Sequence, residues 1–180
     1  MMLFSRSPFQ TLTLISVFCN CLKALRIRNT VYGRGLVVAD TYLCIGNTYL
    51  ELGKHIDAFD NFKESILIRE ELLEEHEAVT TETNFISEAR EPDENAVHQY
   101  SKLIECFEAF FPLYKRLHNE PKVAVGYLQK MGEAYFKIQD YDRAMGRYVL
   151  MRTYLVQVSS IADISDIFQV SSCTRCGSRL

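Results

Sequence analysis

The sequence predicts an all-α fold of antiparallel helix pairs, on three observations. Only 8 Gly and 4 Pro interrupt the 180 residues. The 10 Tyr and 11 Phe follow helical spacings rather than alternating with polar residues, as they would on half-buried strands. Two segments, 39–70 and 125–156, repeat the same spaced pattern of small and large residues, which is typical of stacked helical units.

The composition limits the size of the fold and the classes of partner. Hydrophobic residues make up 48% of the chain, enough for one compact domain with its own core. Charged residues make up 24% and the formal net charge is -3, so no basic field attracts nucleic acid or an acidic bilayer. We therefore expect a protein that binds neither nucleic acid nor membrane.

The repeat is defined by the alignment of Gly46 with Gly132. Five further pairs then coincide: Tyr42 with Leu128, Ile45 with Met131, Tyr49 with Tyr135, Ala58 with Ala144, and Phe62 with Tyr148. Two antiparallel helices approach closely where their side chains are small. We therefore expect Gly46 to face Ala58 and Gly132 to face Ala144, with the large residues filling the space on either side.

These offsets resemble the tetratricopeptide repeat, whose consensus has a large residue, a glycine, a tyrosine, an alanine and an aromatic residue in this order and spacing. The resemblance implies a right-handed superhelical solenoid of antiparallel helix pairs, without cofactor. The endings ALRIR at 24–28 and ILIRE at 66–70 also resemble the kinesin-light-chain type of array.

The spacing predicts the boundaries of the units. Residues 1–10 are expected to be irregular, and the repeats to span 11–158, as a partial repeat 11–36, a repeat 37–76, a degenerate repeat 77–118 and a repeat 121–158. In the degenerate repeat we expect a weak first helix at 78–89 and a second helix at 96–117, which Pro112 should kink or restart near Phe111. Residues 159–180 should form a short helix and a flexible C-terminal tail.

The turns within the two clear repeats differ in one residue. Gly53 stands where a left-handed residue would end a first helix. The second repeat has Gln139 there, followed by Asp140 as a possible N-cap. The apolar run 11–19 loosely imitates a signal peptide, but Thr and Ser interrupt it and no small-x-small cleavage site follows, so we expect part of a helix.

The candidate reactive residues favour structural roles. The six cysteines lie at unrelated spacings, which indicates a reducing, cytoplasmic location: Cys19, Cys21, Cys44, Cys106, Cys173 and Cys176. The Cys173-x-x-Cys176 pair has no second pair to complete a zinc site, so we expect unpaired tail thiols and no bound metal. No catalytic motif is present, and we expect no enzymatic activity.

Two further clusters are open to two interpretations each. The acidic run 70–77 could contact a basic partner, but charge runs more often form a solvated helix face. The aromatic cluster Phe107, Phe110, Phe111 and Tyr114 could line a ligand pocket, but its helical spacing favours the core.

The resemblance places function on the concave surface formed by the first helices of the pairs, where a peptide or helix of another protein can lie. The corresponding residues are Asp40, Leu43, Asn47, Leu50 and Glu51, then Gln129, Glu133, Phe136 and Lys137. Of these, Leu43, Leu50 and Phe136 are candidate apolar anchors. Leu43 stands where the chaperone-binding members of the family carry a lysine, which disfavours a clamp for chaperone tails.

These observations predict a non-enzymatic scaffold or adaptor that binds another protein or peptide. The alternative is a structural element of a larger helical-repeat assembly. In that case the chain would dock through exposed repeat edges onto further repeats or onto itself.

Overall fold

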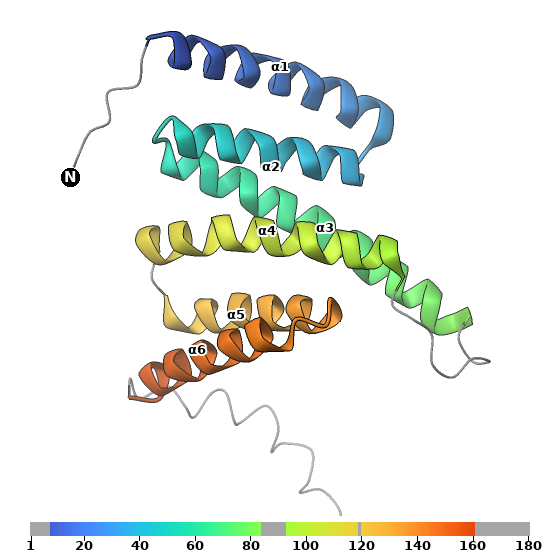
Figure 1. Ribbon diagram of the computed structural model, residues 1–180, viewed down its shortest axis with the longest axis vertical. Coiled ribbons are helices and arrows are strands. Elements are labelled where there is room, and N and C mark those ends of the chain that lie inside the picture. The colour runs from blue at the N-terminus through green and yellow to red at the C-terminus, as the bar shows by residue number, and fades with distance from the viewer. Residues whose placement is uncertain (1–7, 84–92, 119, 161–180) are drawn as a thin grey trace, which may run out of the picture. The chain divides into compact units, whose positions relative to one another are not determined.

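The computed structural model describes residues 8–83, 93–118 and 120–160, and all their secondary structure is helical. The six helices are α1 (Pro8–Tyr32), α2 (Leu36–Glu51), α3 (His55–Thr83), α4 (Glu94–Leu117), α5 (Pro121–Lys137) and α6 (Tyr141–Ser160) (Figure 1). The predicted all-α class is confirmed. Among the helices described, none has the length and apolar character needed to cross a membrane.

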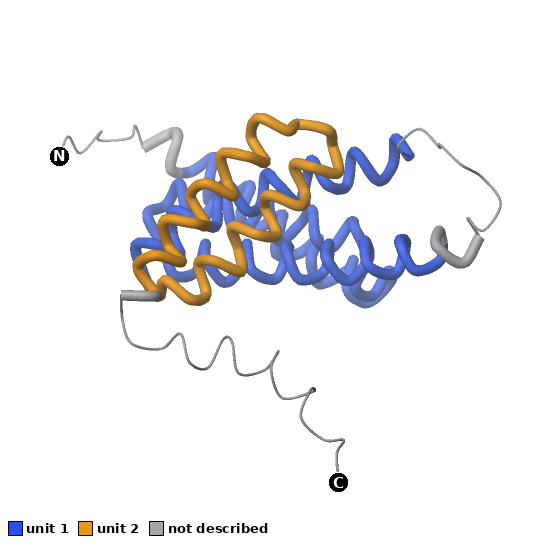
Figure 2. Tube along the Cα trace, turned by 90° about the horizontal axis from the view of Figure 1, so that it is seen from below, with its two compact units in different colours: residues 1–117 blue, residues 118–180 orange. Residues whose placement is uncertain are grey.

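The chain divides into two compact units, 1–117 and 118–180 (Figure 2). In the first unit α1 packs against α2, α2 against α3, and α3 against α4. In the second unit α5 packs against α6. The expected short helix and tail beyond residue 160, with Cys173 and Cys176, lie outside the described residues.

Helices α1 and α2 lie antiparallel in a register that contacts at both ends define. The rings of Phe18 and Tyr49 meet edge to face at 4.8 Å. At the other end, Arg28 Nη1 donates a hydrogen bond of 2.5 Å to Thr41 Oγ1. Between them Leu25 packs on a buried cluster of α2 and α3 side chains, so α1 covers one flank of the α2–α3 pair.

The same pattern recurs between α3 and α4. Phe59 stacks on Phe110 with ring centroids 4.6 Å apart, and Arg69 Nη1 donates to Gln99 Oε1 at 3.1 Å. Phe59 and Arg69 are separated by the same interval as Phe18 and Arg28. Helix α4 therefore makes with α3 the kind of contacts that α2 makes with α1.

The expected first helix at 78–89 is wrong for the part that the structure describes. Helix α3 is continuous to Thr83, so residues 78–83 extend the second helix of the pair, and 84–92 lie outside the described residues. The physical reason is that no Gly or Pro interrupts residues 55–83. Helix α4 begins at Glu94 and ends at Leu117, close to the expected 96–117. Residues 8–10, expected to be irregular, belong to α1, because the proline at its start is favoured in the first turn of a helix. The other repeat boundaries stay predictions.

Helix α4 also does not restart at Pro112. It continues to Leu117 with the proline inside it. The aromatic cluster Phe107, Phe110, Phe111 and Tyr114 is buried, as the core interpretation predicted. Burial of apolar side chains on both sides of Pro112 offsets the backbone hydrogen bond that proline cannot make.

An aromatic ring lies against the glycine of each clear repeat. A Cβ atom added to Gly46 would come within 2.7 Å of two ring carbons of Phe62, and one added to Gly132 within 2.6 Å of the Tyr148 ring. The three atoms nearest an added Cβ thus belong to the rings of Phe62 and Tyr148. That Gly46 faces Ala58 and Gly132 faces Ala144 stays a prediction. Helical side chains lean toward the helix N-terminus, so each aromatic covers the turn that contains the alanine.

The turns that follow α2 and α5 have the same geometry. Gly53 has φ +74° and Gln139 has φ +62°. In each turn the next amide donates back to a carbonyl five residues earlier, Lys54 to Tyr49 at 2.9 Å and Asp140 to Tyr135 at 3.0 Å, which is a Schellman motif. The Asp140 carboxylate also accepts from the Arg143 amide at 3.2 Å, so the predicted N-cap of α6 is confirmed.

Adding a methyl group at the aromatic contact should destabilise the second unit. Gly132→Ala pushes Cβ into the Tyr148 ring and should lower the free energy of unfolding by about 1–3 kcal/mol. Gly126→Ala is the matched control on the same helix, because a Cβ there meets nothing within 4 Å; it should stabilise by about 0.5–1 kcal/mol. Urea denaturation followed by circular dichroism measures both, and equal effects would contradict the packing.

Exchanging the two left-handed residues should move stability in opposite directions. Gln139→Gly relieves the strain of a side chain at positive φ and should stabilise by about 1 kcal/mol, whereas Gly53→Gln introduces that strain and should destabilise by about as much. Thermal melts of the two variants test this. A loss of stability in Gln139→Gly would show that the glutamine side chain contributes more than its backbone costs.

Candidate functional site

Helix α2 exposes one stripe of side chains to solvent. Asp40, Cys44, Asn47 and Glu51 recur every three or four residues and are all exposed, and we call them the α2 stripe. Three of them were predicted as partner-binding residues, and Cys44 was not. A partner can therefore reach this side of α2 along most of its length.

The two leucines predicted on the same surface do not lie on the α2 stripe. Leu43 is buried, with 6% of its surface exposed, and Leu50 is partly buried. Each comes one residue before a stripe residue, so both lie on the same flank of the stripe, where the helix surface turns toward its neighbours. The prediction of Leu43 as an apolar anchor is therefore wrong, and Leu50 offers a partner only part of its side chain.

Helix α5 exposes the residues predicted for the second repeat. Gln129, Glu133, Phe136 and Lys137 are all exposed, and we call them the α5 stripe. Within it Gln129 Nε2 donates to Glu133 Oε1 at 2.9 Å. Figure 1 shows α5 and α6 joined by the short turn at the end of this stripe.

An exposed aromatic pair stands at the turn between α5 and α6. Phe136 is 57% exposed and Tyr141 is 55% exposed. Their rings meet edge to face with centroids 5.4 Å apart and planes inclined by 68°. The turn residues from Ile138 to Asp142 line an open pocket beside them. Paired aromatics that remain this exposed offer a large apolar contact to a partner.

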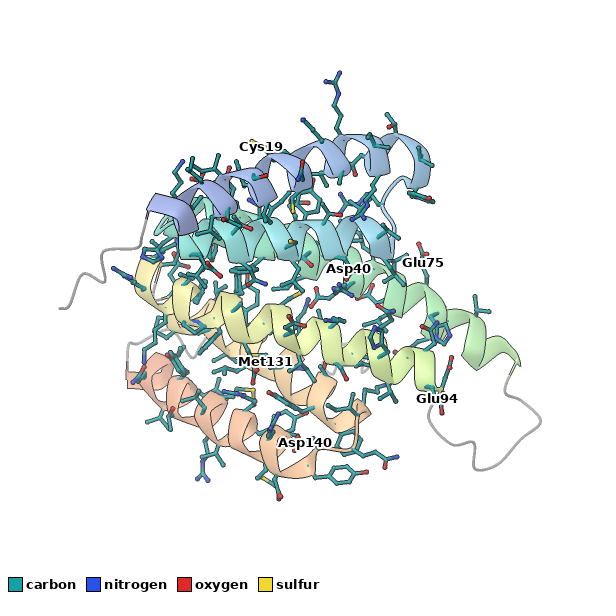
Figure 3. All side chains as sticks on the ribbon, turned by 45° about the horizontal axis from the view of Figure 1, so that its top comes forward. Cys19, Asp40, Glu75, Glu94, Met131 and Asp140 are labelled. Carbon is teal, nitrogen blue, oxygen red and sulfur yellow. The ribbon has the colours of Figure 1, made fainter. Side chains whose placement is uncertain are left out.

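Arg69 is a buried cation that sequence reasoning did not assign. Its guanidinium, with 1% of the side chain exposed, pairs with the Asp40 carboxylate on α2 and donates to Gln99 on α4, while its Nε has no partner in the structure. The signal in the sequence is an arginine directly after the apolar run Ile66–Ile68. A buried charge of this kind needs a counter-charge, so Asp40 (Figure 3) has a structural role.

A second polar bridge lies one turn from Arg69 on α3. Ser65 Oγ donates to the Ala39 carbonyl oxygen at 2.8 Å and lies 3.3 Å from Cys106 Sγ of α4. Burial raises the pKa of the Cys106 thiol above its ordinary value. Ser65 and Arg69 together connect α2, α3 and α4 through polar contacts in an otherwise apolar core.

Part of the acidic run makes contacts within the first unit. Glu71 accepts two hydrogen bonds from Arg34, at 3.1 and 3.3 Å, and these raise the pKa of the guanidinium. The Tyr100 hydroxyl donates to Glu77 Oε1 at 2.5 Å. Glu74 and Glu75 are exposed, as expected for a solvated face. In the part of the chain that the structure describes, no three metal-ligating side chains cluster.

Removing the Asp40 carboxylate should destabilise the first unit. Asp40→Ala leaves the buried Arg69 charge with fewer partners and should lower the free energy of unfolding by about 1–3 kcal/mol. Asn47→Ala, on the same stripe, is the matched control and should stay within about 0.5 kcal/mol. Urea denaturation measures both. Equal stabilities would mean that Asp40 serves only as a surface residue.

The α2–α3 pair is the part of the chain that matches a known protein family. A family model described as tetratricopeptide repeat matches residues 38–78, from the buried Val38 of α2 well into α3. No curated protein matches the chain in sequence. Tetratricopeptide repeats are typically modules of protein–protein interaction rather than catalysis. Residues 38–78, which include most of the α2–α3 pair, are thus similar to a repeat of the tetratricopeptide type, and the helices described form an all-α fold.

Proposed function

We propose that this protein is a non-enzymatic scaffold or adaptor in which the α2 stripe of the first unit and the α5 stripe of the second unit are each a surface that binds a partner peptide or helix. The supporting observation is the position of the stripes: apart from Leu43 and Leu50, the residues that the repeat resemblance assigns to partner binding are exposed on the first helix of each glycine-packed pair. A cytoplasmic location is part of the proposal, because the described cysteines are free thiols.

The chemistry of the stripes favours a partner with an apolar side chain between polar groups. On α5, Phe136 and the neighbouring Tyr141 provide an aromatic anchor, and Glu133 and Lys137 flank it with charges of both signs. Buried aromatic anchors carry much of the energy of protein interfaces. On α2, Asn47 and Glu51 provide polar contacts. Leu43 is buried at the position of the chaperone-binding lysine, which argues against a carboxylate clamp.

Truncating the aromatic anchor should weaken partner binding without unfolding the protein. The full chain, as wild type and as Phe136→Ala, is immobilised, and captured cellular proteins are quantified by mass spectrometry. Phe136→Ala should reduce a specific partner about tenfold or more. Met145→Ala, also an apolar residue of the second unit and 63% exposed, is the matched control and should retain the partner.

Charge reversal at Glu133 tests the polar part of the same stripe, and Asn47→Ala tests the α2 stripe. Circular dichroism and sedimentation of each variant establish that fold and oligomeric state are unchanged. The proposal fails if all three variants retain the same partners as the wild type. It also fails if the Met145→Ala control loses them equally, since the loss would then not belong to the stripe.

The second candidate is a structural element that docks through exposed repeat edges, on itself or on further repeats. The observation that favours it is the apolar surface of α1, where Leu12, Ile15, Leu22, Ile27 and Val31 are all exposed. This candidate is favoured if sedimentation velocity shows that the wild-type chain self-associates and that Ile27→Glu abolishes the association. A monomer whose partner depends on Phe136 would favour the binding stripes.

A further inference from the structure

Two thiols face each other between α1 and α2. Cys21 Sγ and Cys44 Sγ lie 3.4 Å apart, within hydrogen-bond distance for sulfur. The contacts Phe18–Tyr49 and Arg28–Thr41 lie on either side of this pair and hold the two helices in register. The sulfur atoms are therefore held together by the packing of the helices and do not meet by chance rotation of two mobile side chains.

We propose that Cys21 and Cys44 form a reversible disulfide site that takes a low-molecular-weight disulfide of the glutathione class as oxidant. A disulfide bond is about 2.0 Å long, so the two sulfurs need to move together by little more than 1 Å. Small changes of the two χ1 angles on neighbouring helices provide such a movement. The pair spans the turn 33–35, and the cross-link would fasten α1 to α2.

The exposure of the two thiols sets the order of the steps. Cys44 is exposed and belongs to the α2 stripe, whereas Cys21 is partly buried between the helices. The Cys44 thiolate attacks one sulfur of oxidised glutathione, which breaks that disulfide, expels one glutathione thiolate and leaves a mixed disulfide on Cys44. The Cys21 thiolate then attacks Cys44 Sγ and expels the second glutathione. The two protein thiols are oxidised, and one glutathione disulfide is reduced to two thiols.

The surroundings of Cys21 disfavour its thiolate form. Burial and the contact with Cys44 raise the pKa of Cys21 to about 11, and the nearby Arg28 acts in the opposite direction. Since the thiolate is the attacking species, the burial of Cys21 slows ring closure near neutral pH.

The other described cysteines do not compete for this bond. Cys106 is fully buried against Ser65. Cys19 is exposed, two residues from Cys21, and so points to a different side of α1 (Figure 3). It supplies a matched control, because it has the same chemistry and nearly the same position without the contact to Cys44.

The proposal is tested on the full chain by mapping cross-linked peptides. The protein is incubated with oxidised glutathione, quenched with N-ethylmaleimide, digested with trypsin and analysed by mass spectrometry. Trypsin releases Cys19 and Cys21 together in residues 7–23, and Cys44 in residues 35–54. These two peptides should be linked by a disulfide in the wild type and in Cys19→Ala, and separate in Cys21→Ala and Cys44→Ala.

A thermal readout distinguishes a cross-link that fits the native fold from one trapped after unfolding. Oxidised wild type and Cys19→Ala should melt about 5 °C or more above the reduced proteins, and a thiol reductant should reverse the shift. The proposal is overturned if the two peptides stay unlinked, if Cys44 carries only glutathione, if the link persists in Cys21→Ala, or if oxidation lowers the melting temperature. None of these outcomes depends on the proposed partner.

Discussion

The structure depends on the contact between an aromatic ring and a glycine on the facing helix. Phe62 occupies the space over Gly46, and Tyr148 occupies the space over Gly132, at distances that leave no room for a methyl group. This contact brings α3 against α2 and α6 against α5, and burial of Tyr148 raises its pKa. The second helix of a pair thus covers one side of the first helix. The remaining sides of the first helix face neighbouring helices or solvent. The exposed stripes follow from that division.

Neighbouring helix pairs in the first unit are joined by a recurring combination of an aromatic and an arginine. Phe18 and Arg28 of α1 contact α2, and Phe59 and Arg69 of α3 contact α4. The aromatic contributes burial, and the arginine specifies register through hydrogen bonds. Because Arg69 is nearly fully buried, its pairing also constrains Asp40, which links the core of the unit to the α2 stripe.

The exposed residues of the two units differ in chemistry. On α2 the stripe is polar and contains the thiol of Cys44, beside the antiparallel α1. On α5 an aromatic pair stands beside charges of both signs. A protein-binding function and an oxidisable thiol pair are therefore compatible, since the thiols lie where α1 meets α2 and the aromatic anchor belongs to the other unit. The cross-link would act on the attachment of α1, leaving the chemistry of α5 unchanged.

The sequence by itself determined the helical class, the two glycine-packed pairs, the left-handed turn at Gly53 and most of the exposed partner-binding positions, because these depend on local spacing. It could not determine how closely the Phe62 ring approaches Gly46, since the lean of a side chain matters only once two helices face each other. Nor could it show that Leu43 is buried, that α3 runs on to Thr83, or that Arg69 pairs with Asp40. The nearness of Cys21 and Cys44 was equally hidden. Each of these depends on which helices pack together, and tertiary packing alone decides that.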